Sequence, residues 1–67
     1  MQLSARNQLR GVVKGIKLGT VMAEVTVDIG GQDVVAAITR GSVERLDLKE
    51  GEQVTVIIKA TEVMIGK

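Results

Sequence analysis

Three short segments of this 67-residue chain combine hydroxyl groups with positive charge and contain no acidic residue. They are Ser4-Ala5-Arg6, Thr39-Arg40-Gly41-Ser42 and Lys59-Ala60-Thr61. Hydroxyls and backbone N–H groups donate hydrogen bonds, and Lys or Arg neutralises negative charge, so the combination predicts an oxyanion receptor. Each segment alone has a commoner interpretation. For Ser4 it is an unstructured terminus, for Lys59 a solvated strand end, and Thr39 and Ser42 are also residue types that cap helices.

Composition excludes most catalytic chemistry. The chain contains no His and no Cys, so zinc and iron–sulfur ligation, thiol catalysis and hydrolytic triads lack their essential groups. No Gly-x-x-x-x-Gly-Lys-Ser/Thr loop for a nucleotide phosphate is present. Four acidic residues gather near an expected helix and turn, and we interpret them as a solvated surface: Glu44, Asp47, Glu50 and Glu52. The sequence predicts a binding protein without catalytic cofactor, not an enzyme.

Size and apolar content together indicate self-association. A domain of 67 residues has little interior, yet 45% of its residues are hydrophobic. Burial against other copies would accommodate them, so we expect a homo-oligomer. The net charge is only +1, although Arg6, Arg10, Lys14 and Lys17 precede the first acid, and we interpret the last three as a solvated strand face. Without a signal-peptide pattern or a membrane-length apolar run, we expect a soluble cytoplasmic protein with no membrane partner.

Alternating apolar residues predict the strands. Between Thr20 and Ile29, one face carries Val21, Ala23, Val25, Val27 and Ile29. Gly30-Gly31 predicts a hairpin turn into Gln32–Thr39, whose two apolar faces are consistent with a subunit interface. Further strands are expected over 9–18, 53–59 and 62–65. In the first, Val12, Ile16 and Leu18 are expected on one face, and Gly11 and Gly15 predict a bulge or tight bend.

A short helix is expected between the third and fourth strands. Thr39 or Ser42 would cap it, and Val43 and Leu46 share one of its faces. The order of three strands, a helix and two strands predicts an all-β fold. We expect a small five-stranded OB-like β-barrel with one short helix between strands 3 and 4.

The three segments in their wider context resemble one family. Ser4 to Leu9, Ile38 to Val43 and Ile58 to Met64 are similar to the molbindins, the small Mop or molybdenum–pterin binding proteins. The resemblance covers the chain and implies a single Mop/TOBE-type domain over residues 1–67, a unit shared with molybdate-responsive regulators and transporter ATPases. It further implies cytoplasmic binding and storage of molybdate or tungstate. The implied assembly is a hexamer, a trimer of dimers, with oxyanions held between subunits.

The resemblance also implies the residues of the site, in which the metal enters only as an oxyanion. Ser4 and Arg6 would donate from the first segment, and Thr39 and Ser42 would supply hydroxyls. Lys59 would supply charge and Ala60 a backbone N–H. Gly19, Thr20 and Val21 are weaker candidates for a second class of site near a threefold axis.

Two alternative functions remain open at this stage. The barrel type also occurs in nucleic-acid-binding modules, but this chain has no aromatic residue on which bases could stack and a near-neutral charge. We therefore expect no nucleic-acid partner. The other alternative is a structural or regulatory oligomerisation domain taken from a larger regulator.

Overall fold

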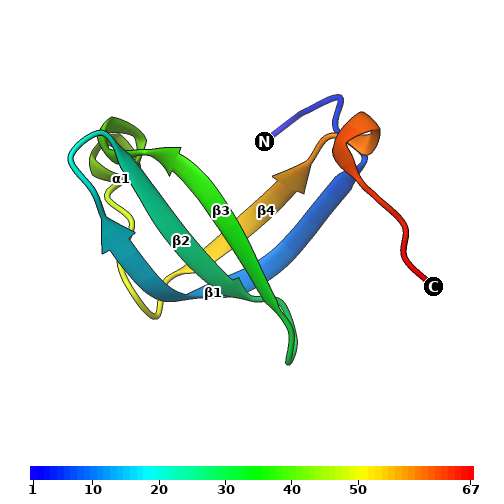
Figure 1. The fold of residues 1–67 in the computed structure, drawn as a ribbon, viewed down its shortest axis with the longest axis horizontal. Helices are drawn as coiled ribbons and strands as arrows, with labels where there is room; N and C mark the ends of the chain where they lie inside the picture. The colour runs from blue at the N-terminus through cyan, green and yellow to red at the C-terminus, as the bar shows by residue number, and fades with distance from the viewer.

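The computed structural model describes all 67 residues and contains one antiparallel sheet of four strands. The strands lie in the order β3-β2-β1-β4, the sheet curls, and the two ends of the long strand β1 lie far apart (Figure 1). The elements are β1 (Asn7–Leu18), β2 (Met22–Asp28), β3 (Asp33–Thr39), α1 (Arg40–Leu46), β4 (Gln53–Ile58) and a 3₁₀ helix, η1 (Ala60–Glu62). An all-β fold with one helix between the third and fourth strands is confirmed.

The long strand β1 changes partner along its length. Residues 7–12 pair with β4, and residues 12–18 pair with β2. The register of the second pairing shifts between Val13 and Gly15, which confirms the predicted bulge. At Gly11 the neighbouring strand approaches closely, because an added Cβ would lie 2.6 Å from the carbonyl oxygen of Asp28. The bulge and the close approach together allow β1 to bend and to pair with β4 in one half of the curled sheet and with β2 in the other.

The core lies on the inner face of this curl. Its buried residues come from β1, β2 and α1: Val13, Ala23, Val25, Val27 and Val43. The predicted inner face of β2 is thus confirmed at three positions, whereas Val21, which precedes the strand, is exposed. For β1 the expected face is confirmed only at Ile16, which packs against the core, and not at Val12 or Leu18. The bulge inverts the alternation, so that Val13 is buried and Val12 and Leu18 are exposed.

The predicted fifth strand is wrong. Residues 60–62 form η1, and residues 63–67 join no ladder. The physical reason lies in the neighbouring strand. The ladder between β1 and β4 ends at the pair Asn7–Ile58, so the chain beyond has no partner within the sheet. The barrel is therefore an open, curled sheet of four strands rather than a closed one of five.

The chain exposes more surface than a compact monomer of its mass. Its accessible area is 5496 Å², whereas the scaling for folded monomers gives about 4,100 Å² at 7.1 kDa. Much of the excess is apolar: Val35 on β3, Met22 on β2 and Ile57 on β4 are all exposed. The difference, about 1,400 Å², exceeds the ~800 Å² that each partner buries in a standard interface. This surface is consistent with the expected self-association.

Candidate functional site

The six predicted site residues form two groups at opposite ends of β1. The terminal group, Ser4, Arg6, Lys59 and Ala60, lies where Asn7 pairs with Ile58. The helix group, Thr39 and Ser42, lies at the other end, where Leu18 pairs with Ala23 and Met22 pairs with Thr39. Twelve residues of strand separate them, a path of about 40 Å, and Figure 1 shows α1 and η1 on opposite sides of the molecule. One chain therefore does not bring both groups to the same small anion.

The terminal group presents donors to solvent. The side chains of Ser4, Arg6 and Lys59 are exposed and make no hydrogen bond or ion pair within the chain. Lys59 precedes η1 as its cap residue without a capping side-chain bond, and the backbone turns there so that Ala60 begins η1. The group thus offers two cations, one hydroxyl and the backbone N–H of Ala60.

The helix group is a pair of linked hydroxyls. Thr39 caps α1, as predicted, and its Oγ1 accepts the backbone N–H of Ser42 at 3.0 Å. The two hydroxyl oxygens lie 2.8 Å apart, and Arg45 donates from Nη2 to Ser42 Oγ at 3.2 Å. The two hydroxyl groups carry two protons, and the hydrogen bond between their oxygens uses one of them. The other proton can therefore be donated to an acceptor outside the pair.

Two arginines flank the helix group differently. Arg40 forms an ion pair with Glu44 at 3.0 Å, four residues further along α1. Arg45 has no acidic partner and directs its charge at Ser42. Arg45 is not among the residues predicted from the sequence. The available signal was its position three residues after Ser42 in an expected helix, a spacing that places two side chains on one face.

The weaker candidates lie beside the helix group. Gly19, Thr20 and Val21 form the exposed turn between β1 and β2. Arg40 joins this turn to α1, because its Nη1 donates to the Gly19 carbonyl at 3.3 Å and its backbone N–H to the Val21 carbonyl at 2.8 Å. The turn is thus fixed to the start of the helix, and its role in binding stays a prediction.

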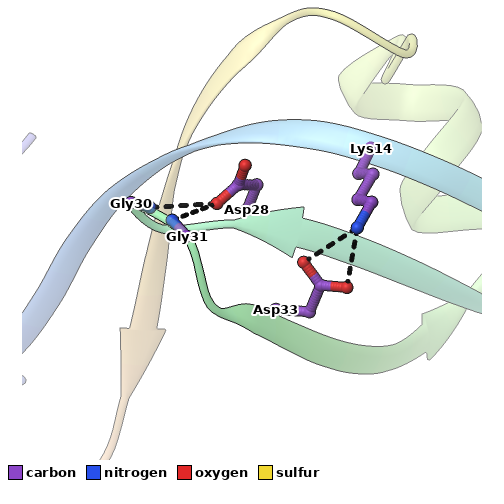
Figure 2. Close-up of polar contacts among 5 residues, drawn as sticks. All are labelled: Lys14, Asp28, Gly30, Gly31 and Asp33. Atoms are coloured by element: carbon purple, nitrogen blue, oxygen red, sulfur yellow. Dashed lines mark hydrogen bonds and ion pairs between the residues drawn. The ribbon is translucent and has the colours of Figure 1, made fainter.

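A second polar cluster lies at the β2–β3 hairpin (Figure 2). The Asp28 carboxylate accepts backbone N–H groups from Gly31 at 2.8 Å and Gly30 at 3.0 Å, and these bonds hold the Asp28 pKa below its ordinary value, with help from the charge of Lys14. Lys14 also forms a 3.0 Å ion pair with Asp33 across the exposed sheet face. These carboxylates would repel an oxyanion, so we interpret the cluster as a turn-stabilising feature.

A concavity of the chain adjoins this cluster, with Asp28 and Gly30 in its lining. It encloses about 580 Å³ beside the junction of β1, β2 and β4, and none of the six predicted residues lines it. No cluster of three or more metal-ligating His, Cys, Asp or Glu side chains is present. Both helices are too short to traverse a lipid bilayer.

Comparison with known proteins gives concordant matches in sequence and structure. The TOBE domain model matches residues 3–65. Molybdenum-pterin-binding protein 1 of Clostridium pasteurianum is 50% identical over 66 residues, 97% of each chain. A molybdate-binding protein from Sporomusa ovata superposes with a TM-score of 0.96 at 49% identity, with full coverage of both chains. The cytoplasmic molybdate-binding protein ModG matches with a TM-score of 0.85 at 44% identity, covering 90% of this chain and 43% of that one.

These matches show the family of this chain and that the family binds ligands. Every relative named above is a binding protein, and the family is one of binding rather than catalysis. The similarity extends along nearly the whole chain and therefore includes both groups of donor residues. This chain belongs to the TOBE domain family and, within it, to the molybdenum-pterin-binding (Mop) proteins.

Proposed function

We propose that this protein binds molybdate or tungstate and serves as a cytoplasmic store of the oxyanion. The anion lies between copies of the chain, in a homo-oligomer built as a hexamer, a trimer of dimers. Relatives that match over their whole lengths and are named for molybdate or molybdenum binding support the ligand class. The excess exposed surface of the single chain supports the assembly.

The chemistry of the donors suits this ligand. At neutral pH molybdate is a tetrahedral dianion with four acceptor oxygens and no proton to donate. Ser4, Thr39 and Ser42 offer hydroxyls, and Ala60 offers a backbone N–H. Arg6 and Lys59 offer charge that no carboxylate of the chain neutralises. Hydrogen bonds that involve a charged partner are shorter and about twice as strong as neutral ones, so these two residues should dominate the affinity.

The separation of the two groups within one chain is the observation that supports a site between subunits. The twelve-residue strand β1 lies between them, and α1 and η1 lie on opposite sides of the molecule (Figure 1), too far apart for one small anion to contact both. A site that uses all six residues therefore takes the terminal group from one copy and the helix group from another. Binding and assembly are then coupled, because the anion stabilises the form that completes its site.

Native mass spectrometry and calorimetry test this function together. Wild-type protein should form an oligomer that gains mass and releases or absorbs heat when molybdate is added. Arg6→Ala and Lys59→Ala should each weaken binding about ten- to hundredfold, since each removes a charged donor. Arg10→Ala is the matched control, an exposed arginine of β1 outside both groups. Assembled protein that shows neither bound anion nor heat with molybdate would refute the proposal.

A further inference from the structure

Two side-chain amides hold the terminal group in place. Asn7, the first residue of β1, donates from Nδ2 to the Ile58 carbonyl at 3.1 Å, and Gln8 donates from Nε2 to the Ala5 carbonyl at 2.8 Å. No other side chain among residues 1–13 makes a hydrogen bond. Chain termini are usually poorly ordered unless they are tied down, so these two bonds restrain the segment that precedes β1.

The Asn7 bond closes the end of the ladder next to two cations. The ladder between β1 and β4 ends at the pair Asn7–Ile58, and Arg6 and Lys59 are the next residues beyond that pair on the two strands. Like charges directly opposite on neighbouring strands destabilise the pairing. Neither cation has an acidic partner within the chain. The amide therefore joins the two strand ends from which these cations extend, and a bound dianion would reduce the repulsion between them.

The Gln8 bond shapes the segment before β1. It spans three residues and fixes the carbonyl of Ala5, the residue between the predicted donors Ser4 and Arg6. Figure 1 shows this N-terminal segment arching beside η1, next to the end of β4. The two amides thus act on the two halves of the terminal group, one on the Ser4–Arg6 segment and one on its junction with Lys59.

We propose that Asn7 and Gln8 are positioning residues of the oxyanion site. They preorganise the terminal group in each chain, before a second copy contributes Thr39 and Ser42, and they do not touch the anion. Preorganisation raises affinity because less conformational freedom is lost when the ligand binds. The inference rests on the proposed function and deepens it by adding two residues to the predicted six.

Near-isosteric variants without a donor test the inference. In Asn7→Leu and Gln8→Met, the molybdate dissociation constant of the assembled protein should rise about three- to tenfold, the effect of one hydrogen bond. Gln53→Met is the matched control, because Gln53 is an exposed glutamine of β4 whose side chain makes no hydrogen bond. Asn7→Gln keeps an amide donor and should recover much of the affinity. Melting of the anion-free proteins is followed in parallel by circular dichroism.

The parallel melting separates positioning from simple stabilisation. A structural role alone would lower the melting temperature of the anion-free variant and leave the dissociation constant of its folded form unchanged, which would overturn the inference. Should Asn7→Leu fail to fold, Gln8→Met decides, since Gln8 is exposed. If the wild-type protein binds molybdate and both variants have the same dissociation constant as the wild type, this inference alone is overturned. If the wild-type protein binds no molybdate, the proposed function is overturned as well.

Discussion

A mixing experiment tests whether each anion site spans two chains. One variant, Arg6→Ala/Lys59→Ala, removes both cations of the terminal group. The other, Thr39→Asp, keeps an oxygen that can accept the Ser42 N–H and so preserves the cap of α1, but places a carboxylate where the dianion would bind. The two cations together contribute about 3–6 kcal/mol to binding, so the first variant should lose a hundredfold or more in affinity. Each variant alone should be unable to hold molybdate at micromolar concentrations.

The separation of the two groups sets the result expected for a mixture. When equal amounts of the variants are unfolded and refolded together, each site receives an intact terminal group in half of the cases and an intact helix group in half. Random assembly between copies therefore restores about a quarter of the sites at wild-type affinity. Sites formed within one chain would stay defective in every subunit, whatever the mixture.

Calorimetry measures the restored fraction through the binding stoichiometry. The control mixes the two folded variants without denaturant, just before titration, so that subunits have no time to exchange. A co-refolded mixture that binds no more molybdate than this control would refute the intersubunit arrangement. Wild-type affinity in either variant alone would show that the group it alters does not contact the anion.

Two further predictions concern the sheet. Gly11→Ala should lower the free energy of unfolding by about 2 kcal/mol, because its Cβ would lie 2.6 Å from the Asp28 carbonyl oxygen. Gly15→Ala meets no atom within 4 Å and serves as control; equal losses in urea unfolding would contradict the reasoning. The Asp28 pKa is lowered by bonds from Gly31 and Gly30, so the stability that the carboxylate contributes is present at neutral pH and lost as pH falls through the folded-state pKa. In Asp28→Ala, the free energy of unfolding should therefore fall less steeply with decreasing pH below about pH 4 than in the wild type; an equally steep fall would contradict this.

Much of the fold could be predicted from local patterns. The alternation along β2 and the Gly30-Gly31 turn are local signals, and both predict the hairpin with β3. The face of β1 could not be predicted, because the bulge between Val13 and Gly15 inverts the alternation, and its position depends on where β1 changes partner. The fifth strand failed for a similar reason: a strand needs a neighbour, and no local pattern shows that the ladder between β1 and β4 ends at Ile58.

The candidate site, too, could be predicted only in part from the sequence. Residue types predicted the donors, and the resemblance to a family assigned them, but neither shows that Thr39 lies at the far end of β1 from Lys59. That separation is a property of the sheet order. The residues that sequence reasoning missed act on the donors rather than as donors. Arg45 contacts Ser42, and Asn7 contacts the carbonyl of Ile58, so their roles depend on contacts that residue type alone does not specify.

On the proposed arrangement, the contact between two copies of the chain supports both the stability of the protein and its binding of the anion. Only five of its 67 residues are buried in the single chain, and all are small aliphatic side chains of Val or Ala. On the proposed arrangement, a second copy covers the exposed apolar faces and also supplies the donors that the first copy lacks. The anion then acts as part of the interface: at one hundred times its dissociation constant it stabilises the assembled form by about 2.7 kcal/mol per site. Affinity consequently depends on chain concentration, because dilution that separates the copies also divides every site into two incomplete halves.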